Sequence, residues 1–223
     1  MDLSKAKQLL KEHRNKVIIL FHHIALFYGL SLYNWEWPYV VMAVVSAYVS
    51  FGIFAHAAHL YFSHGKFKPT WWNIAYAYCV NSFNAIGGVL GFTVLHRHHH
   101  TWEDTPNDPH SPTQIGWWRV YLLLWKKVNT KPSKSKDIIS CKPLRHLHKH
   151  ALKYHFLTSA VLYAINPILM FFMISPSVVY TFHVNGLVNW LGHRDGKPRN
   201  IPEIMWLTPL SWRHGDHHRP HHH

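Results

Sequence analysis

The sequence predicts an all-α, integral membrane protein: four transmembrane helices in two hairpins, with a cytoplasmic helical cap that carries a histidine-rich site for two metal ions. Three observations lead to this prediction. Apolar stretches recur at about the thickness of a bilayer, basic residues are confined to the polar stretches between them, and 23 histidines gather near the ends of the apolar stretches. We interpret residues 1–223 as a single membrane domain.

The basic residues define the expected topology. All Lys and Arg residues lie in 1–16, 66–153 and 194–219, and none lies in 17–65 or 154–193. Basic segments next to membrane spans stay on the cytoplasmic side, so both termini are expected there. A net charge of +13 spread over a soluble surface would favour nucleic-acid binding, but this confinement to juxtamembrane blocks argues against a nucleic-acid partner.

The first hairpin follows from the apolar stretches near the start of the chain. Residues 1–16 are polar and basic, and 17–33 form the first expected crossing, because ~20 helical residues at ~1.5 Å each span ~30 Å. Residues 34–38 contain two tryptophans and a proline, typical of an interfacial turn, and 39–58 return through the membrane. Residues 59–155 are then expected to be cytoplasmic.

The second hairpin is expected at 156–175 and 178–190, with its turn at Ser175-Pro176-Ser177, and 191–223 return to the cytoplasm. The stretch 71–95 is free of charge, but it contains three asparagines and the pair Gly87-Gly88. A full crossing there would also separate histidine clusters on its two sides. We therefore expect 71–95 to be embedded in or lie on the membrane without crossing it.

Four groups of polar residues next to the apolar stretches have the spacing of metal ligands. On a helix, residues three or four apart share a face, so their side chains point the same way. The groups are His59 and His64; His96, His99 and His100; Asn189 and His193; and His214, His217 and His218. Nine imidazoles exceed the need of one tetrahedral zinc, whereas two first-row metal ions would use them all. Imidazole suits several of these metals, so the ligand type does not choose among them.

Residues near these clusters are candidates to support the ligands. Metal-bound histidines usually donate their second N–H to an acceptor, and Asp104, Asp108, Asp195 and Asp216, together with Glu103, lie close to the clusters. Counter-charge for a basic surface is the alternative interpretation. His110 follows Asp108-Pro109 and is a further candidate.

Other histidines are expected to have different roles. His150 and His155 lie among lysines and are interpreted as a solubilising juxtamembrane segment, and His221, His222 and His223 are not expected to be ligands. His22, His23 and His183 fall within expected spans, where neutral, hydrogen-bonded packing is the favoured role.

Two further features of the sequence each have two open interpretations. Small residues on the second span, including Ala43 and Ala47, either line a tunnel for an apolar substrate or allow close helix packing. The lysine-rich stretch 126–153 is either an ordinary loop beside anionic lipid or a docking surface for substrate phosphates or an acidic electron-transfer partner.

The pattern H59-LYFS-H64, H96-RH-HH100, N189-WLG-H193 and H214-GD-HH218, with Asp108-Pro109-His110, resembles the membrane-bound fatty acid desaturases, particularly the stearoyl-CoA (delta-9) branch. The resemblance implies two iron ions (Fe²⁺) that use O₂ and two external electrons to insert a double bond into a saturated fatty acyl chain, carried by CoA or by membrane lipid. It places the nine histidines at the family's ligand positions and Asn189 at a position that reaches metal through water. It also implies a multi-pass protein of the endoplasmic reticulum or bacterial inner membrane.

The sequence departs from that family at several positions. Leu60 and Gly65 stand where arginines are common, and 208–213 lack the usual Gly-Glu-Gly. These differences affect the part of the resemblance that concerns recognition of the substrate head group, and not the metal ligands. No heme-binding His-Pro-Gly-Gly, flavin fingerprint or iron–sulfur cysteine set occurs, so a separate electron donor, a cytochrome b5 or a ferredoxin, is expected. The alternatives are a related di-iron hydroxylase or ketolase acting on an alkane, sterol or carotenoid, and a histidine-rich metal transporter.

Overall fold

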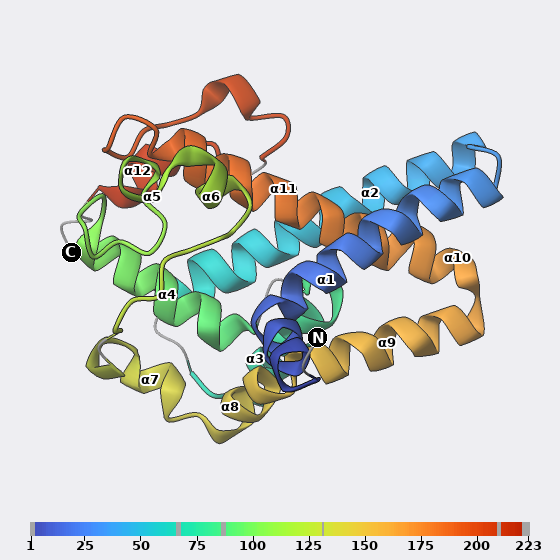
Figure 1. Ribbon diagram of the computed structural model, residues 1–223, viewed down its shortest axis with the longest axis horizontal. Helices are drawn as coiled ribbons and strands as arrows, with labels where there is room; N and C mark the ends of the chain where they lie inside the picture. Colours follow the sequence, from blue (N-terminus) through green and yellow to red (C-terminus); the bar gives the residue numbers. More distant parts are fainter. Residues whose placement is uncertain (1–2, 66–67, 86–87, 131, 209–210, 220–223) are drawn as a thin grey trace.

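The computed structural model describes residues 3–65, 68–85, 88–130, 132–208 and 211–219; the side chains of 3–15, 55–56 and 132–133 are not described. Every regular element in these ranges is helical (Figure 1), which confirms the all-α prediction. Long helices form an elongated bundle, and the short helices gather at one end of it, where the C-terminal helix also lies.

The first hairpin consists of α1 (Leu3–Leu32) and α2 (Trp37–Phe54). The polar start of the chain is continuous with the apolar part of α1, so the boundary expected at residue 16 is a change of composition within one helix. Asn34 and Trp35 turn the chain with φ angles of 51° and 55°. Asparagine tolerates this left-handed conformation better than most residues, which favours the turn at this point.

The second helix runs further than the expected end at residue 58. α2 continues directly into the π-helix η1 (Ala55–His64), so the helix carries both His59 and His64. Next come α3 (Trp71–Asn84) and α4 (Val89–Trp102). α3 begins where the Thr70 hydroxyl accepts a hydrogen bond from the Asn73 N–H. α3 and α4 meet at a bend of 90°, so the charge-free stretch 71–95 is a broken helix pair and not one straight helix.

The turn of the second hairpin lies elsewhere than predicted. α9 (Ala151–Ile165) ends at Asn166-Pro167, and α10 (Pro167–Leu169), η3 (Met170–Ile174) and α11 (Ser175–Gly192) then run on as one helix. The predicted spans 156–175 and 178–190, with a turn at 175–177, are therefore wrong. Asn166 has extended backbone angles and its side chain caps the Ile168 N–H, so Pro167 starts a helix.

Pro176 lies in the first turn of α11, directly after the π-helical turn η3. Proline is tolerated in the first turn of an α-helix, so the longer helix continues through this point. Two serine hydroxyls add hydrogen bonds to backbone carbonyls nearby: Ser175 donates to Met170 at 3.2 Å and Ser177 donates to Met173 at 2.5 Å. The Ser-Pro-Ser sequence consequently marks an irregular helix and not a turn.

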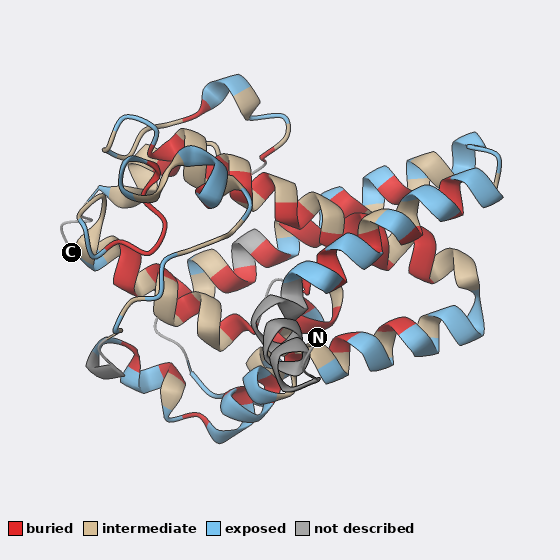
Figure 2. Cartoon of the chain, viewed as in Figure 1, coloured by how far each residue is buried: buried red, intermediate tan, exposed pale blue. Residues whose placement is uncertain are grey.

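Two helical segments in the described ranges are long and apolar enough to cross a membrane, Trp37–His64 and Pro167–Gly192, and the bent pair α3–α4 makes a third if counted as one span. The apolar part of α1, Lys16–Leu32, is slightly shorter. These helices indicate a membrane protein, and four crossings stay a prediction. Large apolar side chains are exposed along their outer faces, as in lipid-facing helices (Figure 2). They include Leu20, Ile24, Phe27, Val44, Val45, Val49, Leu157, Val161 and Ile165.

Short helices build the cap at one end of the bundle (Figure 1). In chain order they are α5 (Pro112–Ile115), α6 (Trp117–Tyr121), η2 (Pro132–Ser135), α7 (Lys136–Ile139), α8 (Lys142–Lys149), η4 (Pro202–Ile204) and α12 (His214–His218). One apolar core joins α2, η1, α3, α4, α8 and α11, with Phe51, Phe62 and Leu144 almost fully buried. The cap and the bundle therefore share a core, and the ends of the long helices are fixed beside the cap.

Two histidine pairs join α1 to the rest of the bundle. His155, expected at a solvated surface, is fully buried, and its Nδ1 lies 2.6 Å from the Ser82 carbonyl oxygen and its Nε2 lies 2.8 Å from Nε2 of His22. His23 and His183 face each other through Nε2 at 2.9 Å. The hydrogen-bonded packing role predicted for His22, His23 and His183 agrees with these contacts. The solvated role predicted for His155 is wrong, because α9 packs this face against α3.

Candidate metal centre

Nine histidines from four separate stretches of the chain meet where the long helices end at the cap. They come from η1, from α4, from the residue that follows α11, and from α12. Neighbouring rings of this set lie 4.0–6.3 Å apart between centroids. The set consists of the residues expected from the sequence: His59, His64, His96, His99, His100, His193, His214, His217 and His218.

One part of this centre, which we call the five-histidine group, has one ring nitrogen from each member within 4.8 Å of every other. Its members are His59, His64, His96, His100 and His217. The Nε2 atoms of His59 and His217 are 2.6 Å apart, and Nε2 of His96 lies 2.9 Å from both His64 and His100. All these contacts join Nε2 to Nε2, so the rings point at a common space.

The π-helix explains how the loosely spaced pair in η1 takes part. His59 and His64 are five residues apart, which in an α-helix would leave their rings on different parts of the surface. The i→i+5 hydrogen bonding of a π-helix brings residues five apart onto one face, and the two ring centroids lie 5.6 Å apart. π-helical turns occur frequently at functional sites, and this one aligns two candidate ligands.

A second part, which we call the carboxylate-backed group, consists of His99, His193 and His218. Each of these rings donates its Nδ1–H to a different carboxylate. His99 donates to Asp108 at 2.8 Å, His193 to Asp104 at 2.8 Å and His218 to Glu103 at 2.5 Å. Because each proton is on Nδ1, each Nε2 offers a lone pair to the space between the rings. His214 adjoins the group, with its Nε2 2.8 Å from Nε2 of His193.

The three carboxylates belong to the short loop that follows α4. Asp104 has a φ of 54°, in the left-handed region that aspartate tolerates, and this turns the chain back toward the rings. Asp108 accepts the backbone N–H groups of Asp104 at 2.9 Å and His110 at 3.0 Å, and Ser111 donates its hydroxyl to Asp104 at 2.6 Å. The loop is therefore fixed through its own acidic side chains.

Burial and these hydrogen bonds set the protonation of the loop. Burial raises the pKa of Asp108 to about 6 and raises the pKa of Glu103. Burial also acts to raise the pKa of Asp104, but the hydrogen bonds from His193 and Ser111 outweigh it, and the pKa lies below its ordinary value. The short contacts to the ring nitrogens make each of the three carboxyls a hydrogen-bond acceptor.

Burial favours the neutral form of several of the rings. Burial, followed by neighbouring imidazoles, lowers the pKa of His214 and His218 far below 6.5. Burial also lowers the pKa of His110 to about 3. Metal binding requires the unprotonated imidazole, so burial favours the form of these rings that binds metal.

The donor atoms fit metal ions. In the carboxylate-backed group, Nε2 of His99 and Nε2 of His218 are buried and have no hydrogen-bond partner among the described residues. In the five-histidine group, Nε2 of His96 meets two other Nε2 atoms at hydrogen-bond distance, more contacts than one proton can satisfy. A cation in each space would satisfy the convergent lone pairs, and imidazole is a common ligand of first-row transition metals.

The other residues predicted for the site lie in different settings. His110 packs on His99 with ring centroids 4.1 Å apart. Its buried Nδ1 has no hydrogen-bond partner among the described residues, and Oδ1 of Asp108 lies 3.9 Å away. Asp195 pairs with Arg194, and Asp216 pairs with Arg213 and Arg219. The ion pairs of these two aspartates in the described structure are therefore with arginines and not with histidine rings. His98, within the same histidine run, contacts the Asn107 carbonyl instead. His221, His222 and His223 lie outside the described residues.

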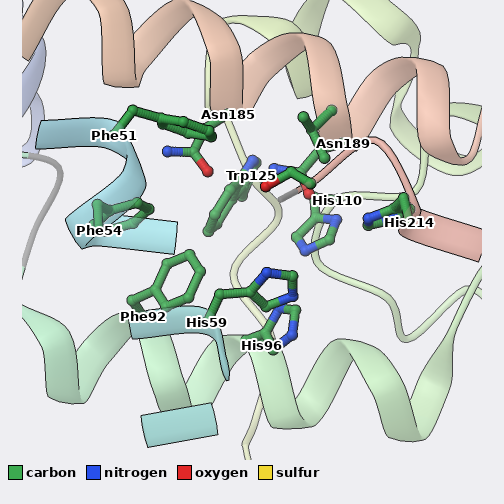
Figure 3. Close-up of a pocket in the computed structure, with 12 residues that line it drawn as sticks. Phe51, Phe54, His59, Phe92, His96, His110, Trp125, Asn185, Asn189 and His214 are labelled. Atoms are coloured by element: carbon green, nitrogen blue, oxygen red, sulfur yellow. The ribbon is translucent and has the colours of Figure 1, made fainter. Parts of the chain in front are cut away.

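A pocket with a largely apolar wall adjoins the rings (Figure 3). Phe51 and Phe54 lie on one side of it, and Phe92 lies beside His59 and His96 on another, with its ring stacked on His96 at 5.5 Å between centroids; Trp125 lies between the two sides in this view. Asn185 and Asn189 project from α11, and Asn189 lies on the side of His110 and His214. The sequence did not single out these aromatic residues; Phe51 and Phe54 are three apart on the second span, a spacing that indicates a shared face.

Ala43 and Ala47, proposed from the sequence as tunnel residues, are buried on α2 at 8% and 6% exposure. Ala43 packs in a cluster with Met170, Phe171 and Phe172 of the second hairpin. Neither alanine lines the pocket beside the rings, which α2 enters further along, at Phe51. Their tunnel role stays a prediction, and close packing accounts for their burial.

Comparisons with known proteins identify relatives across most of the chain, although no protein-family model matches it. The chain is 25% identical over 220 residues to the chloroplastic palmitoyl-monogalactosyldiacylglycerol delta-7 desaturase of Arabidopsis thaliana, covering 92% of this chain and 58% of the relative. It is 26% identical over 214 residues to the acyl-CoA C20 Δ5-desaturase of Anemone leveillei, covering 88% and 67%. It is 28% identical over 211 residues to the delta-9 acyl-lipid desaturase 1 of Arabidopsis thaliana, covering 85% and 67%.

These relatives, all named as desaturases, match 85–92% of the chain at 25–28% identity, which supports a fatty acid desaturase family for this chain. The histidine pattern led to the same resemblance. The chain spans about three fifths to two thirds of the length of these relatives. Some of these relatives are named for acyl-lipid substrates and one for an acyl-CoA substrate. The comparison therefore does not decide whether lipid or CoA carries the acyl chain.

Proposed function

We propose that this chain is an oxygen-dependent fatty acyl desaturase with a centre of two iron ions. The observation that carries the proposal is the convergence of nine imidazoles beside an aromatic-lined pocket at the ends of apolar helices. The family supports the reaction, and the buried nitrogens without partners support the metal. The orientation proposed for the chain puts the cap and both termini on the cytoplasmic side.

The histidines and their carboxylates have the task of holding the ions. The five-histidine group would bind one ion, and the carboxylate-backed group with His214 would bind the other. Asn189 would contribute through a water, because it lies near His214 at the pocket. Bound iron, supplied with O₂ and electrons, provides the oxidant needed to remove hydrogen from an unactivated methylene, which no side chain can do.

The pocket has the task of holding one carbon pair and excluding water. Phe51, Phe54 and Phe92 offer an apolar wall that suits a methylene chain and offers no hydrogen bonds to solvent. An acyl chain drawn from the bilayer would lie with its reacting carbons toward His59 and His96. The cap would hold the polar head group, carried by CoA or by lipid.

The proposed reaction is –CH₂–CH₂– + O₂ + 2e⁻ + 2H⁺ → –CH=CH– + 2H₂O. The substrate gives up two hydrogens, and two electrons come from outside the site. A cytochrome b5 or a ferredoxin would supply these electrons. The lysine-rich cap segment 126–153 offers a positive surface for such an acidic partner.

Expression of the chain in a host fed saturated fatty acids tests the proposal. We expect a new double bond in extracted fatty acids, and loss of that product in His96→Ala. His150→Ala is the matched control, because His150 follows α8 and is not among the convergent rings. A new hydroxyl or keto group would point instead to the sister oxygenase chemistry. Absence of any new product with iron bound and an electron donor present would contradict the proposal.

A further inference from the structure

We propose that the two metal positions are unequal: the carboxylate-backed group takes up the first divalent ion and holds it more tightly than the five-histidine group holds the second. This inference rests on the proposed two-metal centre and adds an order of filling to it. Asp104 and Asp108 are then positioning residues for the ligands of that first ion.

The inequality starts from the hydrogen bonds behind the rings. Three ligands of one position have a carboxylate each on Nδ1, at 2.8, 2.8 and 2.5 Å. Such a partner fixes the tautomer and the ring orientation and makes Nε2 a stronger donor to metal. The side chains of His99, His193 and His218 are 0–1% exposed, so the ring ends of these bonds are shielded from water, while the Glu103 side chain is 24% exposed.

The other described carboxylates are engaged elsewhere. Asp137, Asp195, Glu203 and Asp216 all pair with arginines. Glu36 lies in the turn between α1 and α2, away from the cap. Glu103 also lies near the other position, because one of its oxygens is within 4.8 Å of a ring nitrogen of His100. Asp104 and Asp108 contact rings of the carboxylate-backed group, so most of the negative charge that the described residues direct at the metal centre lies at that position.

Net charge then decides the order of filling. A divalent ion among neutral imidazoles alone brings two positive charges into a buried site, which is costly without nearby negative charge. At the carboxylate-backed group, three carboxylates stand directly behind the ligands and offset that charge. Coulomb attraction grows as the effective dielectric falls, so the buried setting enlarges the difference. The first ion consequently binds among His99, His193 and His218.

Isosteric variants of the loop test this inference through metal binding alone. Metal-free protein, purified in detergent, is titrated with Co²⁺ against a chelator of known affinity, and the metal content is measured after gel filtration. We expect two resolved binding steps for the unmodified chain. Asp104→Asn and Asp108→Asn keep an acceptor oxygen and remove one charge. Each should weaken the tighter step about 10–100-fold and leave the other step in place.

Two further variants complete the test. His64→Ala should remove the weaker step and preserve the tighter one, since it removes a member of the five-histidine group. Asp195→Asn is the matched control, because this exposed carboxylate lies two residues from His193 but pairs with Arg194. It should leave both steps unchanged. Circular dichroism and elution volume show whether each variant retains the helical fold.

The possible failures are distinguishable. Equal affinities for the two ions, parallel loss of both steps in Asp104→Asn, or loss of the tighter step in His64→Ala would overturn the inference while a functional two-metal desaturase remained. Fewer than two ions bound by the unmodified, folded chain would instead overturn the proposed two-metal centre itself.

Discussion

A methyl group added at Gly192 tests whether His214 must lie where the structure has it. Gly192 is the last residue of α11, directly before His193, and it is buried. A Cβ atom there would lie 2.4 Å from Cδ2 of His214 and 3.0 Å from its Cγ and Nε2. Ordinary contact begins at 3.4 Å, so the ring would have to move by about 1 Å.

The expected effect of Gly192→Ala is functional and not a loss of fold. His214 is 3% exposed and its Nε2 lies 2.8 Å from Nε2 of His193, so a 1 Å shift changes the position of a donor atom in a packed centre. A misplacement of this size at a reacting centre costs about 100-fold in rate. Alanine is also a better helix former than glycine by ~1 kcal/mol, so the helix itself is not weakened.

Gly52→Ala is the matched control, because a Cβ at Gly52 in α2 meets no atom within 4 Å. Both variants are expressed in a fed host, and the unsaturated product is measured per mole of purified protein, together with helical content. We expect Gly52→Ala to match the unmodified chain and Gly192→Ala to fall about 100-fold. Full activity in Gly192→Ala, with the helices retained, would show that His214 is not a constrained member of the centre.

Three further outcomes follow from other contacts. His22→Ala should lower the free energy of unfolding in detergent by about 1–3 kcal/mol, because it removes the Nε2 partner of buried His155; an unchanged unfolding midpoint would contradict this. The hydrogen bonds from Arg97 lower the pKa of Asp137, so this pair stabilises the fold above the unfolded-state pKa and the effect is lost as pH falls through the lower folded-state pKa. Asp137→Asn should therefore lower the free energy of unfolding at pH 7 by less than about 1 kcal/mol. Its thermal midpoint should lie below that of the unmodified chain at pH 7, and the two midpoints should converge as the pH falls below about 4. Ala47→Phe should shift the preferred acyl length if α2 lines a tunnel there, and an unchanged product profile in a folded variant would leave only the packing role.

The sequence was most informative where a pattern is local. The i, i+3, i+4 spacing of His96, His99 and His100 requires only an α-helix, and α4 has one there. His214, His217 and His218 likewise share the short helix α12. The confinement of basic residues separated the polar segments from the apolar ones without reference to tertiary contacts. Helix periodicity and charge confinement act within a few turns of chain, so they are readable from sequence.

Irregular helices and turns were not readable in the same way. A π-helix over 55–64 has no sequence signature that the pattern of apolar residues could reveal, although it aligns His59 with His64. Pro176 indicated a turn, but it lies in the first turn of α11 directly after the π-helix η3, and the helix continues through it. Whether a proline ends a helix depends on the backbone geometry around it, which the sequence pattern does not give.

The supporting carboxylates show the same division. Four aspartates and one glutamate near the clusters looked equivalent in the sequence, yet Asp104, Asp108 and Glu103 contact rings whereas Asp195 and Asp216 pair with arginines. The difference is the backbone between them. The left-handed turn at Asp104 directs one loop back over the centre, and nearness in sequence does not encode that direction.

The final cluster depends on contacts outside its own helix. α12 has five residues, too few for an isolated helix to be stable in water. The Asp216 N–H donates to the Asn200 side chain at 3.0 Å, the Ile201 N–H donates to the Trp212 carbonyl at 2.8 Å, and Gly215 lies directly against the backbone of Arg199. A Cβ at Gly215 would lie 2.8 Å from that backbone, so only glycine permits this approach. The segment 199–201 therefore holds α12 in place. The spacing of the three histidines of α12 brings their rings to the centre only because α12 packs against this earlier segment.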